Sequence, residues 1–306
     1  MVDVVQEEEG VLKSGLVYGG LSPLKSKKSF YCVLRERVIE LHESEKSQKK
    51  NKTPKLIIDL AICFNVNRKV DTKLKECVSI MMPDECYVLR GETDEQTEDW
   101  YDAFISAAIP ARALHLGRPV SRDEFFECAW EVTLMKYPKL KKAPPRADLE
   151  DLCAKNPKLL GDKRLCFYPH AVVICERGIE PATTGIPTSC IPPFKKEDFI
   201  EVQLMYVANF GKQEKYFFMR MGRSAPTGSG EIWAMAESGE VATDMHNKLN
   251  KIVERESEKK RQLGVGPLVH PRTTSSSRHP GSSGSSHRER SNTQPQRQRT
   301  PSIDNM

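Results

Sequence analysis

Apolar and polar residues alternate along several short stretches of this chain, most clearly at residues 216–221. This segment reads Tyr-Phe-Phe-Met-Arg-Met and contains no proline, so it predicts a β-strand whose apolar residues, at every second position from Phe217, share one face. The sequence Thr-Gly-Ser-Gly at 227–230 predicts a turn, because glycine tolerates backbone angles that a side chain forbids. Ile232 then begins a second apolar strand.

Two segments show the spacing of amphipathic helices instead. Thr93 and Gln96 form a predicted capping box. The apolar residues that follow predict a helix with one apolar face, which packs against one end of a sheet. A second helix is predicted over about 240–261, and most of its apolar stripe is expected in a core. The apolar positions are Trp100, Phe104 and Ala107 in the first helix and Val241, Met245, Leu249 and Ile252 in the second.

One cation lies between the two predicted strands, in an otherwise apolar and glycine-rich region. Arg223 follows the end of the first strand, with the hydroxyls of Ser224 and Thr227 close by in sequence. A guanidinium held in this way suits a phosphate or a carboxylate, which it binds through paired N–H groups. The pattern alone is more typical of a surface arginine beside a hairpin turn.

Length and composition predict two small domains and a tail. The chain has 306 residues and 38% hydrophobic residues, which is enough for two modest cores. From Arg272 onward it is composed mainly of Ser, Thr, Pro, Arg and Gln, with Ile303 as the only aliphatic residue. Such a composition cannot bury enough apolar surface to offset chain entropy, so we expect disorder over 258–306.

The distribution of charge argues against a nucleic-acid partner. The net charge is +5, and residues 272–306 contribute +4 of it through six arginines, one Glu and one Asp. The remainder is nearly neutral and carries no zinc-finger or RNP-like motif, so we expect no nucleic-acid binding.

Cysteine usage and the absence of metal-binding and catalytic motifs narrow the functional class of the protein further. The nine cysteines form no Cys-x-x-Cys pair, which suits a reducing compartment. No histidine, cysteine or carboxylate cluster has metal-ligand spacing, and no nucleophile elbow, Walker loop or kinase signature is present. The N-terminus is acidic and no run reaches the roughly 18 apolar residues of a membrane span. We therefore expect no catalytic residues, no metal and no cofactor, and a cytoplasmic location.

The arginine motif resembles a known domain. Gly-Arg-Ser-x-x-Thr-Gly-x-Gly-Glu-x-Trp at 222–233, followed by a helix with Met245-His246, is similar to the phosphotyrosine-binding (PTB) domain of the insulin receptor substrate family. Downstream-of-kinase docking proteins carry a similar signature. The match extends from about Phe125 to Glu256 and includes the segments Trp130-Glu131-Val132, Leu159-Leu160-Gly161 and Gln203-Leu204-Met205.

The first third of the chain resembles the pleckstrin-homology (PH) domain of the same family. The similarity lies in Gly15-Leu16, residues 30–35 and residues 63–67, and it closes on Trp100. The resemblance implies a mainly β protein with capping helices (α+β): two PH-like seven-stranded sandwich or barrel domains, each closed by a C-terminal helix. The expected boundaries are a flexible N-terminus at 1–8, a PH domain at 9–112, a linker at 113–119, a PTB domain at 120–257 and a disordered, basic, Ser/Arg-rich tail at 258–306.

The resemblance also implies the binding residues. In this family a phosphorylated Asn-Pro-x-Tyr peptide adds to an edge strand, expected here near 202–207, and lies against the last helix. PH domains often use lysines of the first hairpin to contact phosphoinositides. The expected residues are Arg223, Ser224, Thr227 and Lys212 for the phosphotyrosine, Leu204, Met205, Met245 and Leu249 for the peptide groove, and Lys25, Lys27, Lys28 and Arg35 for the PH ligand.

Both sites depart from the family pattern. A second arginine usually follows the edge strand, but Ala208 and Asn209 occupy its place, with Lys212, Lys215 or Arg220 as substitutes. In the PH domain, Val17-Tyr18 and Ser29 stand where basic residues are usual, so we expect unselective contact with lipid or with acidic protein motifs. Proline-containing insertions at 138–158 and 178–198 lengthen two loops near the groove.

The resemblance implies a non-enzymatic adaptor that binds insulin- or IGF-type receptor tyrosine kinases at the inner face of the plasma membrane. All eight tyrosines precede residue 217, so the usual tail of tyrosine motifs is absent and a truncated isoform, fragment or competitor is implied. A membrane-tethered scaffold that binds peptides without phosphotyrosine, and an enzyme fragment, are the alternatives.

Overall fold

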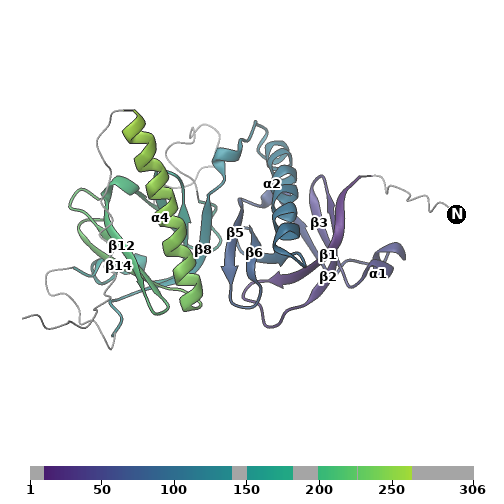
Figure 1. Ribbon diagram of the computed structural model, residues 1–306, viewed down its shortest axis with the longest axis horizontal. Helices are drawn as coiled ribbons and strands as arrows, with labels where there is room; N and C mark the ends of the chain where they lie inside the picture. The colour runs from purple at the N-terminus through teal and green to yellow at the C-terminus, as the bar shows by residue number, and fades with distance from the viewer. Residues whose placement is uncertain (1–9, 140–149, 182–198, 226, 264–306) are drawn as a thin grey trace, which may run out of the picture. The chain divides into compact units, whose positions relative to one another are not determined.

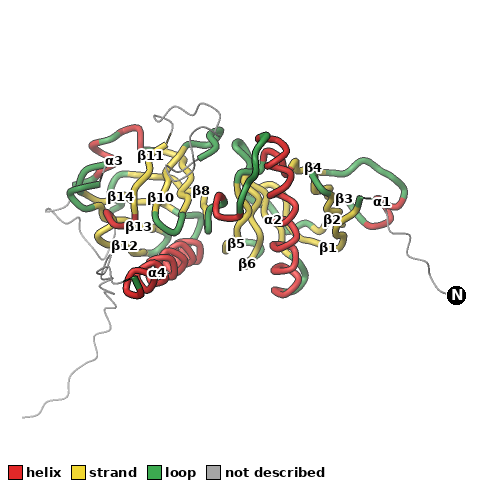
Figure 2. Tube along the Cα trace, turned by 90° about the horizontal axis from the view of Figure 1, so that it is seen from above, coloured by secondary structure: helices red, strands yellow, loops and turns green. Residues whose placement is uncertain are grey.

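Two seven-stranded antiparallel sheets and two long helices make up the part of the chain that the computed structural model describes (Figure 1). That part comprises residues 10–139, 150–181, 199–225 and 227–263. Strands hold more residues than helices in each domain, and each domain has one long helix (Figure 2). The expected mainly β architecture with C-terminal capping helices is confirmed.

The first domain has the strand order β4-β3-β2-β1-β7-β6-β5. A bulge in β1, between Val11 and Lys13, shifts the register of its pairing with β2. The helices are α1 (Glu45–Lys49) and α2 (Asp94–Leu116), and the strands are β1 (Val11–Leu21), β2 (Ser29–Arg35), β3 (Val38–His42), β4 (Leu56–Asp59), β5 (Asn65–Asp71), β6 (Lys75–Met81) and β7 (Cys86–Arg90).

Helix α2 begins at the predicted capping box. The Thr93 hydroxyl accepts a hydrogen bond from the Gln96 amide at 3.2 Å. The Gln96 side chain reaches back to the Glu92 amide, at 2.9 Å, one residue earlier than a standard box. Trp100 and Phe104 are buried and stacked at 5.2 Å, so this face closes the sheet as expected.

The same helix extends further than the sequence suggested. It continues to Leu116, through the first residues of the expected linker, and ends where Gly117 adopts a left-handed φ of 65°. Beyond it, the Arg118 guanidinium binds both carboxylate oxygens of Glu124 at 3.0 and 2.7 Å. Burial alone would raise the pKa of Glu124, but hydrogen bonds from Arg118 and the Ser121 amide lower it overall.

The second domain has the strand order β11-β10-β9-β8-β14-β13-β12. Its two edges, β11 and β12, are consecutive in the chain and are joined by the short 3-10 turn η5 (Leu204–Tyr206). The helices are α3 (Leu152–Lys155) and α4 (Gly239–Gln262), and the strands are β8 (Cys128–Met135), β9 (Gly161–Phe167), β10 (Ala171–Cys175), β11 (Phe199–Gln203), β12 (Val207–Gln213), β13 (Tyr216–Met221) and β14 (Gly230–Met235).

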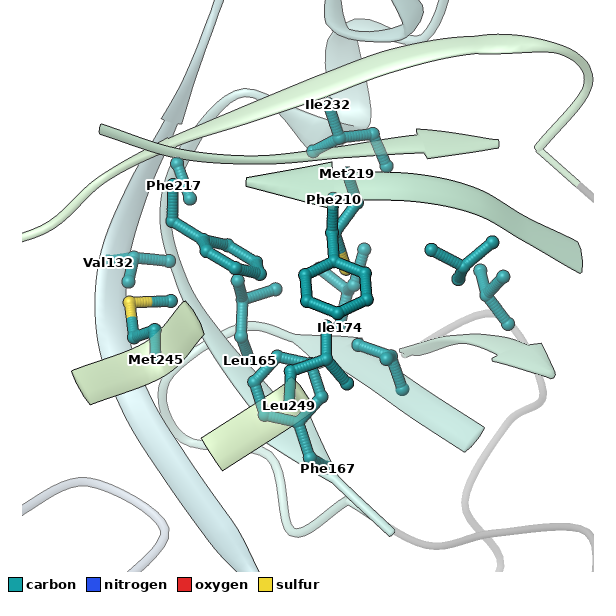
Figure 3. Packing of buried hydrophobic residues seen from close by; sticks show 14 of the residues in the cluster. Val132, Leu165, Phe167, Ile174, Phe210, Phe217, Met219, Ile232, Met245 and Leu249 are labelled. Carbon is teal, nitrogen blue, oxygen red and sulfur yellow. The ribbon is translucent and has the colours of Figure 1, made fainter. Parts of the chain in front are cut away.

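The alternation at 216–221 produces the expected strand. In β13, Phe217, Met219 and Met221 are buried, and the residues between them are half-buried. The stripe of α4 packs on this side of the sheet, with Met245 and Leu249 among the core side chains (Figure 3). The helix continues to Gln262, so 258–262, expected in the tail, are helical. Residues 264–306 of the expected tail and the N-terminus at 1–8 lie outside the described residues.

Candidate functional site

Arg223 lies in the turn that follows β13. The Gly222 amide donates to the Tyr206 carbonyl at 2.7 Å, which ties the turn to the start of β12. Ala225 is buried in the core and anchors the other side, while Arg223 and Ser224 remain exposed. Within the described ranges, no side chain pairs with the Arg223 guanidinium. The turn therefore presents a cation whose donors are available to an anion.

Glycines shape the second half of this turn. Gly230 has a φ of +149°, and a Cβ placed there would lie 2.5 Å from the carbonyl oxygen of Glu150. The neighbouring Glu231 amide donates to that same carbonyl at 2.8 Å. The segment before α3 thus packs against the start of β14 so closely that only glycine fits. Thr227 is half-buried and donates to the Gly228 carbonyl at 3.3 Å.

Arg220 is not available as a second phosphate ligand. Its Nε and Nη2 atoms donate to Glu231 Oε1 at 3.2 and 2.9 Å. The other oxygen of Glu231 accepts from Trp233 Nε1 at 3.1 Å. Glu231 is 6% exposed, and a buried carboxylate left without its partners would be strongly destabilising. The sequence analysis missed this cluster, although Glu231 and Trp233, two residues apart, share one face of a strand.

Lys212 also lies away from Arg223. It pairs with Phe217 near the tip of the β12–β13 hairpin, whereas the turn with Arg223 follows the Val207–Met221 pair. Five strand residues separate these ends, or about 17 Å. The Lys212 ammonium instead donates to Thr243 Oγ1 on α4 at 2.8 Å. The structure therefore does not bring Lys212 to the predicted phosphotyrosine site.

The two positions of the missing arginine lie at the start of β12. Ala208 is exposed and falls in a bulge between Val207 and Asn209. Asn209 uses its side-chain oxygen to accept from the Phe210 amide at 2.9 Å. Neither residue supplies a positive charge beside Arg223, as the sequence indicated.

The edge strand next to α4 is β12, not residues 202–207. Val202 and Gln203 end β11, the next three residues form η5, and only Val207 belongs to β12. The segment Leu-Met-Tyr of η5 contains no glycine or proline, so nothing in the sequence marked this break. Among the described strands, β12 has a neighbour on one side only. Its free edge can accept an added strand.

Met245 and Leu249 belong to the core rather than to the groove. Both are 0% exposed and point into the cluster beneath the sheet (Figure 3). The helical stripe correctly identified which residues share a face, but that face is covered. The flank of α4 that meets β12 carries other residues. Thr243 binds Lys212, and the His246 ring lies 5.6 Å from the Phe210 ring.

Leu204 and Met205 of η5 line a small pocket just before β12, at the opposite end of that strand from Lys212. Its volume is about 90 Å³, and Val253 and Lys260 of α4 contribute to its walls. Leu204 is 5% exposed and Met205 is 58% exposed, so Met205 is the accessible apolar side chain. These two predicted groove residues therefore lie together beside α4.

The cationic residues predicted for the PH ligand fall into two places. Lys25, Lys27 and Lys28 are exposed in the loop between β1 and β2, and the Lys27 ammonium lies 4.2 Å above the Tyr18 ring. Arg35 ends β2, about 20 Å along the strand from that loop, and binds Glu40 at 3.2 Å. The three lysines form one basic loop, and Arg35 is not part of it.

The described ranges show neither a metal-ligand cluster nor a helix with the length and apolar character that a bilayer span requires. The eight described cysteines are buried and free of disulfides. Residues 140–149 of the insertion at 138–158 and residues 182–198 of the second insertion lie outside the described ranges.

Comparisons with known proteins agree with this division. Residues 6–108 match the PH domain family, and residues 158–256 match the family described as PTB domain (IRS-1 type). Among curated proteins, Insulin receptor substrate 1-B of Xenopus laevis is 27% identical over 233 residues, which cover 69% of this chain and 19% of that protein. Insulin receptor substrate 1 of Homo sapiens is 25% identical over 226 residues, which cover 69% of this chain and 17% of that protein. The chain thus spans less than a fifth of these relatives.

Proposed function

Since the chain is a PH domain followed by a PTB domain of the IRS-1 type, similar to insulin receptor substrates, we propose that it is a non-catalytic signalling adaptor. Its PTB domain binds Asn-Pro-x-phosphotyrosine segments of receptor tyrosine kinases of the insulin or IGF type. The observation that carries this proposal is the exposed, unpaired Arg223 beside the free edge of β12.

The peptide is bound by strand addition. Its backbone pairs with β12 while α4 forms the second wall, so that affinity comes mainly from main-chain hydrogen bonds. Arg223 binds the phosphate through charge-assisted hydrogen bonds, and the Ser224 hydroxyl adds a neutral one. Met205 offers an apolar surface near this end of the groove.

The PH domain adds a second, weaker contact. Lys25, Lys27 and Lys28 present three ammonium groups on one exposed loop, without the planar geometry of an arginine. Such a loop binds phosphoinositide head groups, or acidic protein surfaces, at the inner face of the plasma membrane. In this proposal, the PH contact concentrates the chain near receptors, and the PTB domain selects among them.

A second candidate follows from the single arginine. With Ala208 and Asn209 in place of a second cation, and with Arg220 held by Glu231, phosphate contributes less than it would to a two-arginine site. The chain would then be a membrane-tethered scaffold or a competitor whose PTB domain binds peptides whether or not they are phosphorylated.

A titration of the full chain with two matched peptides separates these candidates. The peptides share an Asn-Pro-x-Tyr sequence and differ only in the phosphate, and isothermal titration calorimetry measures each dissociation constant. The adaptor proposal expects tighter binding of the phosphopeptide. Equal affinities favour the scaffold, and absence of binding to either peptide by the folded chain would overturn both.

A further inference from the structure

Two side-chain contacts connect β12 to α4, and they follow one another along the groove between this strand and the helix. Phe210 and Lys212 are two residues apart on the strand and therefore project from the same face. They meet His246 and Thr243, which are one helical turn apart on α4. The contact between Phe210 and His246 is aromatic. The contact between Lys212 and Thr243, nearer the hairpin tip, carries a positive charge.

The charge of Lys212 is not neutralised by its partner. Thr243 is a neutral hydroxyl that donates its own hydrogen to the Gly239 carbonyl at 2.7 Å and so accepts from the ammonium. Lys212 is exposed and, among the described residues, has no carboxylate within ion-pair distance. The adjacent turn holds Glu214 and Lys215, whose charges cancel, so Lys212 leaves a local positive charge on this part of β12.

The position of Lys212 along β12 fixes which part of a bound peptide it faces. Five residues, or about 17 Å of extended chain, separate it from the Val207–Met221 pair beside the phosphate site. An antiparallel peptide covers that length in about five residues and runs toward its own N-terminus as it approaches the hairpin tip. Asn-Pro favours a turn and proline cannot donate to a strand ladder, so the paired part of the peptide ends at the asparagine, beside Val207. Lys212 therefore faces a position about five residues before the asparagine of the Asn-Pro-x-Tyr segment.

We infer that Lys212 selects peptides with an acidic side chain at that upstream position. This inference rests on the proposed function, because it assigns a preference to the same peptide groove. An exposed pair of this type contributes about two- to fivefold in affinity and is screened by salt.

The test uses phosphopeptides that carry a single Glu at the fourth, fifth or sixth residue before the asparagine, each matched to the same peptide with Gln. Titration of the full chain at low salt is expected to show a two- to fivefold preference for Glu, strongest near the fifth position, that shrinks in high salt. Lys212→Gln is expected to remove the preference. Lys215→Gln, which removes a nearby exposed charge, is expected to retain it.

The outcomes separate this inference from the proposed function. If the phosphopeptides bind but Glu and Gln are equivalent at all three positions, the acidic preference is wrong and the adaptor function stands. If the preference survives in Lys212→Gln, a group other than Lys212 binds the acidic side chain of the peptide and the inference fails. If no phosphopeptide binds to the folded chain, the proposed function fails and the preference fails with it. Thermal unfolding of both variants checks that the fold is intact.

Discussion

Glu231 explains why one arginine is free and another is not. Its nearly buried carboxylate binds Arg220 and Trp233, and so fixes the side chains at the base of the β13–β14 hairpin. Arg223, three residues further along, lies beyond the reach of this cluster in a turn anchored by Ala225. The sequence predicted the exposed arginine from its position at the end of a strand. It gave no sign that Arg220 was already occupied, because its partner belongs to the next strand.

Gly230 offers a test at the scale of one residue. We expect Gly230→Ala to destabilise the fold by about 1–3 kcal/mol, because alanine at a φ of +149° is strained and its Cβ would lie 2.5 Å from the Glu150 oxygen. Gly228→Ala is the matched control, since that glycine also has a positive φ but faces open space. Urea unfolding measures both. An equal or smaller loss in Gly230→Ala would show that the Glu150 segment does not pack as described.

Helix α4 carries its core side chains and its contacts with β12 on different flanks. Its apolar stripe forms the core of the second domain, while the flank next to β12 presents Thr243 and His246. Periodicity could predict the helix and the stripe, and it did so correctly. It could not show which flank stays open, because this depends on where β12 lies. That strand was misplaced by several residues since η5 carries no turn-forming residue.

Substitutions on the two flanks of α4 should therefore differ in how much they change the free energy of unfolding. Met245→Ala is expected to lower the free energy of unfolding by about 2–5 kcal/mol, because it leaves a cavity in a fully buried cluster. His246→Ala, one residue away, is expected to change it by less than about 1 kcal/mol, since the ring contacts only the rim. Chemical denaturation of the two variants tests this. Comparable losses would mean that the groove flank is part of the core.

Across the whole chain, both domain types were predictable from sequence because their motifs are spread over many positions. The sheets, the two long helices and the Trp100 face all agree with those expectations. Which of the candidate binding residues lie together was predicted less well. Arg35 and the basic loop share β2 but occupy its opposite ends, and Lys212 and Arg223 share a hairpin in the same way. Closeness in sequence did not become closeness in space, because an extended strand adds over 3 Å per residue.

Buried thiols in both domains make stability sensitive to alkaline pH. Burial raises the pKa of Cys63 to about 12 and that of Cys153 to about 11, whereas an unfolded thiol has a pKa near 8.5. The folded state therefore holds these protons more tightly than the unfolded state. The contribution of these thiols to the free energy of unfolding is complete below about pH 8.5, and it declines as the pH rises toward their pKa values in the folded state.

We expect the urea midpoint of the reduced protein to fall between pH 7.5 and pH 9.5. Iodoacetamide labelling of Cys63 and Cys153, followed by mass spectrometry, provides the control for burial, because both should react slowly until the protein unfolds. A midpoint that rises over this range, or rapid labelling in the folded state, would contradict the burial of these thiols.

The central claim is that Arg223 holds the phosphate of a bound phosphotyrosine. Its most direct test is the difference in affinity between phosphorylated and unphosphorylated Asn-Pro-x-Tyr peptides, measured by calorimetry for the unmodified chain, for Arg223→Gln and for Lys251→Gln, an exposed cation of α4. We predict that phosphate improves binding by about 1.5–3 kcal/mol, or about tenfold to a hundredfold, in the unmodified chain and in Lys251→Gln. In Arg223→Gln this gain should nearly vanish. A gain that is absent from the unmodified chain, or unchanged in Arg223→Gln, would contradict the account.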